Sequence, residues 1–188
     1  MGQVVGVVAV QGDFEKHVDA FLRVGAECVR EVRTPEELAD VDRLVIPGGE
    51  STTVGKLMQR FGLGDAIIER AKAGMPLWGT CMGMILMARE VEGSDQYSLD
   101  LLDIAVDRNA FGAQVHSFED EVKVELWEKP LTSVFIRAPV VTQVGAGVEI
   151  LAKYDGKTVA VRQENRVGTS FHPELTEDGR FHEWFLSL

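Results

Sequence analysis

The first half of the chain alternates continuous apolar runs with stretches of helical periodicity. Residues 4–10 form a nearly unbroken aliphatic run, which is typical of a strand buried on both faces. Apolar residues then recur at helical spacing and predict a helix whose buried face includes Phe14, Val18, Phe21 and Leu22. Strands that alternate with helices in this way indicate a parallel sheet with helices on both faces.

The same alternation continues beyond the first helix. Further strands are expected at 27–32, 44–46 and 77–78, and further helices at 65–73 and after residue 81. Ser51 is a suitable N-cap for another helix, whose buried stripe would run from Val54 to Phe61. This segment therefore continues the pattern of a doubly covered sheet.

The second half has a different pattern, in which short apolar segments are separated by turn residues. The expected strands are residues 122–126, 134–137, 148–154, 158–162 and 167–171. Asp155-Gly156 is a strong hairpin signal. With no internal repeat and no linker, we expect one domain over residues 1–188. Its fold class is α/β with three layers: a mostly parallel central sheet, helices on both faces and a small antiparallel addition.

Composition and charge narrow the classes of function. The 188 residues are 45% hydrophobic and 26% charged, as in a globular domain with a substantial core. The net charge of −11 argues against a nucleic-acid partner or an anionic membrane surface. No apolar run approaches the roughly 20 residues that span a bilayer, and the N-terminus lacks the basic region of a signal peptide. Two widely spaced cysteines suit free thiols in the cytoplasm, which is the expected location.

One of these cysteines lies in a pattern typical of a nucleophile. Cys81 is the centre of Gly79-Thr80-Cys81-Met82-Gly83, between an apolar strand pattern and a helical one. Such a Gly-x-Cys-x-Gly turn exposes the central side chain, and the helix dipole there favours the thiolate. A lone cysteine is more often a small buried apolar residue, as we expect of Cys28, but the turn favours a nucleophile.

A base and an acid follow far downstream. His172 comes directly after the last expected strand, and Glu174 is placed to hold one ring nitrogen while the other faces sulfur. His17 and His182 lie among charged neighbours on expected helices, and His116 lies in a polar loop. We expect these three to be surface residues, which leaves His172 as the base.

Thioester chemistry also needs N–H donors for the oxyanion. The amide of Met82, the residue after the nucleophile, supplies one by the geometry of the turn. The second is expected from Gly49, because the adjacent Gly48 and Gly49 allow the backbone to approach a substrate closely.

Two competing motifs fail on their spacing. A phosphate-binding loop would need Ser or Thr after Gly55-Lys56, where the chain has Leu57. A zinc deaminase would need Pro-Cys-x-x-Cys after His172-x-Glu174, and none follows. We therefore expect no metal and no cofactor.

Several segments together resemble a known family. The cysteine turn with a distant His-Pro-Glu resembles the class I, or triad, glutamine amidotransferases. Within that class, segments spread over nearly the whole chain are similar to the glutaminase subunits of pyridoxal 5′-phosphate synthase. These segments are residues 10–12, 47–53, 93–95, 108–112, 134–139 and 170–176.

The resemblance implies a class I glutamine amidotransferase-like, flavodoxin-like fold and the hydrolysis of L-glutamine to glutamate and ammonia. The ammonia would pass through an internal route to a separate synthase subunit, which builds pyridoxal 5′-phosphate. By the family pattern, Cys81 attacks the side-chain amide, His172 relays the proton and Glu174 orients His172. The family's free glutaminase is nearly idle until the synthase docks.

The resemblance also implies the contacts with the substrate. The residues at these family positions are Gly48, Gly49, Glu50, Arg108, Ile136 and Arg137. The planar guanidinium of an arginine suits a carboxylate, which agrees with an amino-acid substrate. Gln11 matches a position near the active site at the interface with the synthase.

Three alternatives stay open from the sequence. The chain could serve another amidotransferase with the same triad, such as imidazole glycerol phosphate synthase. It could be a non-catalytic scaffold subunit, although a scaffold does not require Cys81, His172 and Glu174 together. A thiol protease or esterase on this fold lacks support, because Arg108 and Arg137 indicate a small amino-acid substrate.

Overall fold

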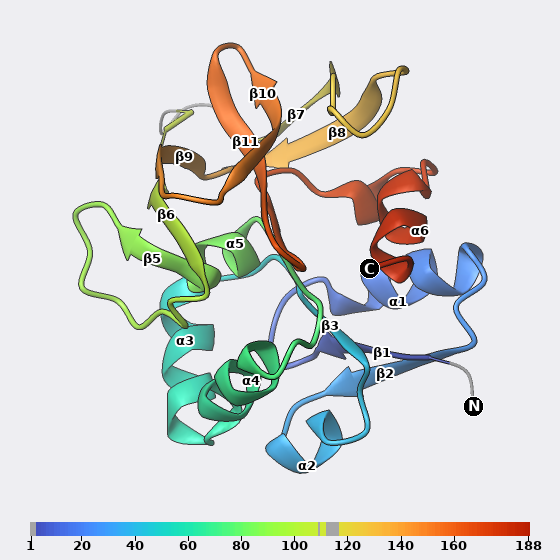
Figure 1. Cartoon of the computed structure of the whole chain (residues 1–188), viewed down its shortest axis with the longest axis vertical. Coiled ribbons are helices and arrows are strands. Elements are labelled where there is room, and N and C mark those ends of the chain that lie inside the picture. The colour runs from blue at the N-terminus through green and yellow to red at the C-terminus, as the bar shows by residue number, and fades with distance from the viewer. Residues whose placement is uncertain (1–2, 109, 112–116) are drawn as a thin grey trace.

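Figure 1 shows a computed structural model of the chain, which describes residues 3–108, 110–111 and 117–188. The helices are α1 Phe14–Arg23, α2 Pro35–Leu38, α3 Ser51–Arg60, α4 Leu63–Lys72, α5 Met82–Met87 and α6 Arg180–Leu186, with a 3-10 helix, η1, at Pro173–Leu175. The strands are β1 Val4–Val8, β2 Cys28–Val32, β3 Arg43–Ile46, β4 Leu77–Thr80, β5 Ala88–Val91, β6 Leu102–Asp107, β7 Ser117–Val122, β8 Leu131–Ile136, β9 Val140–Val144, β10 Glu149–Tyr154, β11 Lys157–Gln163 and β12 Arg166–Thr169.

Most of these strands form one large sheet. Its order is β2-β1-β3-β4-β12-β11-β9-β6-β5, and β10 pairs with β11. The pairs from β2 to β12 are parallel, whereas β12, β11, β9 and β6 pair antiparallel. β7 and β8 form a separate antiparallel pair. The expected parallel core with an antiparallel addition is therefore confirmed.

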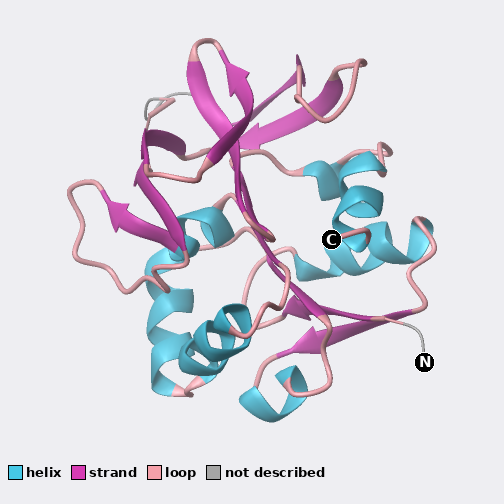
Figure 2. Ribbon diagram, in the orientation of Figure 1, coloured by secondary structure: helices cyan, strands magenta, loops and turns pink. Residues whose placement is uncertain are grey.

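Helices cover both faces of the parallel part, as Figures 1 and 2 show: α1 and α6 lie on one side, and α3, α4 and α5 on the other. Adjacent residues of a strand point to opposite faces, so one strand contributes to both layers. On β4, Leu77 packs into the cluster beneath α3 and α4, and Trp78 packs into the cluster with Phe181 and Phe185 of α6. Burial of apolar side chains on both sides fixes the sheet between the helices.

Two side chains expected in the core are exposed instead. The side chains of Leu22 and Phe61 are 53% and 61% exposed. The buried face of α1 runs through His17, Ala20 and Phe21, and Leu22 is turned about 100° away from Phe21. Phe61 follows the last residue of α3 as its C-cap, where the helical stripe no longer applies.

The structure confirms the hairpin predicted from the sequence but not the predicted helix N-cap. Asp155 and Gly156 have φ of 49° and 76° between β10 and β11, so the predicted hairpin is confirmed. The N-cap of α3 is Glu50 rather than Ser51, and its carboxylate accepts hydrogen bonds from the amides of Thr52 and Thr53. In the described part of the chain, no helix is long and apolar enough to cross a membrane.

Candidate active site

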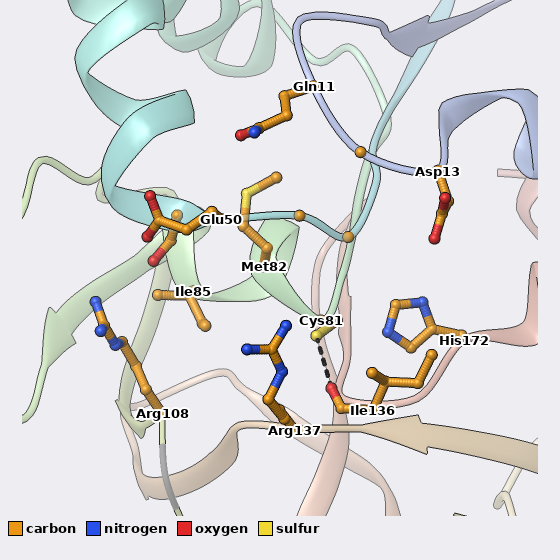
Figure 3. Close-up of a pocket in the computed structure, with 14 residues that line it drawn as sticks. Gln11, Asp13, Glu50, Cys81, Met82, Ile85, Arg108, Ile136, Arg137 and His172 are labelled. Atoms are coloured by element: carbon orange, nitrogen blue, oxygen red, sulfur yellow. Dashed lines mark hydrogen bonds between the residues drawn. The ribbon is translucent and has the colours of Figure 1, made fainter. Parts of the chain in front are cut away.

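The carboxyl ends of the parallel strands meet at one edge of the sheet, where a pocket of about 390 Å³ opens (Figure 3). Loops after β1, β3, β4 and β12 reach this edge, which is where ligands bind in open α/β sheets. The lining residues are Gln11, Gly12, Asp13, Gly48, Gly49, Glu50, Ser51, Cys81, Met82, Ile85, Arg108, Ile136, Arg137 and His172. Segments far apart in the sequence thus form one site.

The backbone around Cys81 has the strained form of a nucleophile turn. Cys81 lies between β4 and α5 with φ of 51°, which a non-glycine residue rarely adopts. Its amide donates to the carbonyl of Thr169 at 2.7 Å, which ties the turn to β12. A Cβ on Gly79 would lie 2.4 Å from the carbonyl carbon of Gly83, so the turn closes only with glycine there.

His172 and Glu174 lie beside this cysteine. Nδ1 of His172 is 2.6 Å from Oε1 of Glu174, and both side chains are buried. Nε2 of His172 is buried without a hydrogen-bond partner among the described residues, and the ring faces the Cys81 sulfur (Figure 3). The thiol donates a 3.7 Å hydrogen bond to the carbonyl of Ile136. The structure therefore brings the predicted nucleophile, base and acid together.

The surroundings of His172 favour its protonated form. Burial alone would lower the pKa of His172, but the neighbouring Cys81 and Glu174 outweigh burial and raise it to about 10. Burial would raise the pKa of Glu174, but nearby His17 and His172 lower it to about 2. An anionic Glu174 stabilises a protonated His172, which is the role of the acid in a triad.

Two arginines supply positive charge to the pocket wall. Arg108 donates to Oε1 of Gln96 at 2.5 Å, and Arg137 has no ion-pair partner among the described residues. Arg137 also has φ of 44°, a second strained backbone position on the pocket wall. Neither guanidinium is neutralised by a described carboxylate, so both are available to an anionic ligand.

Glu50 lines the pocket and is also the N-cap of α3. Its two oxygens accept the amides of Thr52 and Thr53 at 2.9 and 2.8 Å. Hydrogen bonds lower the pKa of Glu50 to about 2, with the side chain of Thr53 contributing most and the amide of Thr52 next. A carboxylate held in this way is a fixed negative charge at the pocket wall, suited to an ammonium group.

The remaining predicted site residues also line the pocket. Gln11, on the loop that follows β1, lines the pocket together with Met82 (Figure 3). Met82 is the first residue of α5, so its N–H has no acceptor within the helix. Ile136 ends β8 and contributes the carbonyl that faces Cys81.

The loop with Gly48 and Gly49 lies directly against His172. A Cβ on Gly48 would be 2.6 Å from Cε1 of the imidazole ring. A Cβ on Gly12 would in turn lie 1.9 Å from the carbonyl oxygen of Gly48. Glycine at 48 therefore lets the loop and the base occupy the same wall of the pocket.

We expect Gly48→Ala to reduce the glutamine hydrolysis that the family resemblance implies by about 100-fold or more, because the added methyl group would displace His172 from its position beside sulfur. Steady-state assays of glutamate release would check this, with circular dichroism to confirm the fold. Gly55→Ala is the matched control: its Cβ meets only flexible side chains and one carbonyl at 3.2 Å or more. Equal activity in Gly48→Ala and the wild type would contradict the expected contact.

Sequence reasoning missed part of the site and misplaced two histidines. Asp13, Ser51 and Ile85 line the pocket, and only the packing of the loop after β1 with α3 and α5 indicates this. His17 and His182 were expected at the surface, but both are fully buried. That prediction was wrong because their charged sequence neighbours lie on the opposite faces of α1 and α6.

Some predicted features lie outside the described residues. His116 is one of them, as are Asn109 and Gly112 of the family-like segment that contains Arg108. In the part of the chain that the structure describes, no group of three or more His, Cys, Asp or Glu side chains is arranged to hold a metal ion.

Comparison with known proteins agrees with this geometry. The chain is 53% identical over 189 aligned positions to the pyridoxal 5′-phosphate synthase subunit PdxT of Herpetosiphon aurantiacus, covering 98% of this chain and 99% of that one. It is 50% identical over 186 residues to PdxT of Desulforamulus reducens, covering 98% of each. A crystal structure of a glutamine amidotransferase superposes with a TM-score of 0.92 and 48% identity, covering 97% of both chains. The sequence profile of the SNO glutamine amidotransferase family matches residues 7–188, and the chain belongs to this family.

Proposed function

We propose that this chain hydrolyses L-glutamine to L-glutamate and ammonia through Cys81, His172 and Glu174. Family membership makes it the glutaminase subunit of a pyridoxal 5′-phosphate synthase, which supplies ammonia for vitamin B6 synthesis. The observation that carries the triad is the placement of the buried His172–Glu174 pair beside Cys81, which lies on a strained turn (Figure 3). Residues 1–188 act in this proposal as one glutaminase domain.

The chemistry proceeds in two displacements at the side-chain amide. The Cys81 sulfur attacks the amide carbon, and Met82 and Gly49 offer N–H donors to the oxyanion. The carbon–nitrogen bond breaks as His172 gives its proton to the departing nitrogen, which leaves as ammonia. His172 then takes a proton from water, whose oxygen attacks the thioester and releases glutamate. Glu174 stays ionised and stabilises the imidazolium in both steps.

The pocket walls suit the rest of the glutamine molecule. Arg108 and Arg137 offer guanidinium groups to the α-carboxylate, and Glu50 offers a carboxylate to the α-ammonium group. Gly48, Gly49 and Ile136 contribute backbone to the wall near the reacting amide. Charged groups at one end and the nucleophile at the other would orient glutamine with its side chain toward Cys81.

The proposed partner is the synthase subunit, a PdxS-type protein, in a hetero-oligomer. The relatives of this chain are named as subunits of pyridoxal 5′-phosphate synthase, which supports a separate partner for this chain. Gln11 lies on the pocket wall and is proposed to face that partner. The two free thiols, Cys28 and Cys81, support a reducing cytoplasm as the location.

The experiment that tests this function measures glutamate from glutamine with and without the synthase subunit of the same organism. We expect little glutamate from the free chain and at least about ten-fold more in the complex, because docking would complete the oxyanion site. A synthase of the histidine pathway is the control for partner choice. No glutamate with either partner would contradict the proposed activity, and activation only by the histidine-pathway synthase would contradict the proposed pathway.

A further inference from the structure

Two buried histidines lie behind the triad, on the side away from the pocket. His17 on α1 and His182 on α6 are both fully buried. The ring of His182 lies edge-on to Phe21 and Trp78, with centroids 4.8 and 5.0 Å away. An apolar side chain would fill this aromatic environment without the cost of burying polar nitrogens. The imidazoles therefore need a reason beyond packing.

Their nitrogens form a chain of contacts that ends at the triad acid. Nε2 of His182 is 3.1 Å from Nδ1 of His17, and Nε2 of His17 is 3.1 Å from Oγ1 of Thr80. The same Nε2 of His17 lies 3.4 Å from Oε2 of Glu174. That oxygen has no hydrogen-bond partner among the described residues, because His172 binds the other oxygen. His17 thus provides the polar atom that faces the free side of the buried carboxylate.

The environment keeps both histidines neutral. Burial lowers the pKa of His17, with Glu174 and Asp13 opposing that effect and His172 adding to it. Burial lowers the pKa of His182 most, and His17 and Arg23 lower it further. The charge of Glu174 opposes these effects, and the resulting pKa is about 3. A neutral His17 presents an N–H dipole to the carboxylate. It adds no second positive charge that would compete with protonated His172 for the same group.

The contacts also select one tautomer. Nδ1 of His182 is buried without a partner among the described residues, so its proton belongs on Nε2, which then donates to Nδ1 of His17. His17 must in turn carry its proton on Nε2, the atom that faces Thr80 and Glu174. His182 therefore sets the direction in which His17 donates.

Resting on the function proposed above, we infer that His17 is a positioning residue for the triad. Its Nε2–H, oriented by His182, donates to Thr80 and lies 3.4 Å from the free oxygen of Glu174. There its dipole stabilises the negative charge of the carboxylate, so that the other oxygen keeps His172 aligned with Cys81. Without this dipole, the buried carboxylate would lose a neighbour that stabilises its charge and would take up the proton of His172, so the base would lose its charged partner.

The test compares His17→Phe with His17→Gln in the complex with the synthase. For His17→Phe we expect kcat to fall about 10- to 100-fold, because the base is no longer held in place. The KM for glutamine should stay unchanged, since His17 does not line the pocket. The alkaline limb of kcat/KM should move to lower pH, because His172 loses its proton more readily beside a neutral Glu174. His17→Gln keeps an N–H donor and should retain most of kcat and the wild-type pH profile.

A wild-type kcat and pH profile in His17→Phe would overturn the inference, and so would equal losses in both variants. Nitrogen-15 NMR of histidine-labelled wild-type protein tests the inference independently of whether the variants fold. A neutral His17 protonated at Nε2 supports the inference; a charged ring or a proton on Nδ1 overturns it. A wild-type complex that releases no glutamate would refute the proposed function itself, which is a separate result.

Discussion

Cys81→Ala should abolish glutamate release in the presence of the synthase, with a fall in kcat of at least about 10⁴-fold. The variant lacks the sulfur that forms the thioester, and no other described nucleophile in the pocket has a base beside it. Ser51, the other hydroxyl or thiol side chain among the described residues of the pocket, donates to Gln96 instead. The measurement is a coupled glutamate assay on the purified complex, with a detection limit low enough to resolve this fall.

Cys28→Ala is the matched control, because Cys28 lies on β2 at the far edge of the sheet from β12 and His172. This variant should keep full activity. A glutamine-analogue electrophile should label the wild type once, at Cys81, and should leave Cys81→Ala unlabelled. Full activity in Cys81→Ala would contradict the triad, and failure to label the wild type in the complex would favour a scaffold role.

The grouping of Cys81, His172 and Glu174 was predictable because each of these residues carries a local signal. Cys81 has glycines that permit a strained turn, and His172 and Glu174 follow a strand within one short segment. The parallel core was predictable for the same reason, since strand and helix periodicities alternate regularly up to β4 and α5. Local sequence patterns determine these features, and the fold then brings them to one edge of the sheet.

The part that could not be predicted depends on contacts between distant segments. His17 has charged neighbours in sequence, and only the packing of α1 against α6 and β4 places it next to Glu174. Gln96 likewise has no local signal, although it holds both Arg108 and Ser51 through its side-chain oxygen. Burial and partners of this kind are properties of the tertiary structure, so a single sequence does not reveal them.

The presence of an antiparallel region was predictable, but the bounds of its strands were less so. The segment expected as a strand at 122–126 begins where β7 ends, at Val122, and β6 and β9 were not expected at all. β7 has charged residues at three successive positions from Glu119, so its apolar alternation is weak. Pairing with β8 outweighs that weak local preference, as is common for strands at the edge of a domain.

Gly83→Ala should destabilise the protein by about 3 kcal/mol or more, since the new methyl group would meet backbone that cannot move aside. A Cβ at position 83 would lie 1.9 Å from the carbonyl oxygen of Ile46. Gly83 lies in α5 and Ile46 ends β3, so relief of this overlap requires the helix to move away from the sheet. Thermal denaturation would detect the change as a fall in Tm of about 10 °C.

Gly55→Ala distinguishes this clash from a general effect of filling space at a buried helical glycine. Its Cβ would meet the end of Leu86 at 3.2 Å and the ring of Tyr97 at 3.4 Å, which can shift slightly. Alanine also favours the helix at that position, so Tm should change by only a few degrees. Equal Tm values for Gly83→Ala and the wild type would contradict the close packing of α5 on β3. Because α5 begins directly after Cys81, a displaced α5 would also move the nucleophile, so activity should fall further than the population of folded protein does.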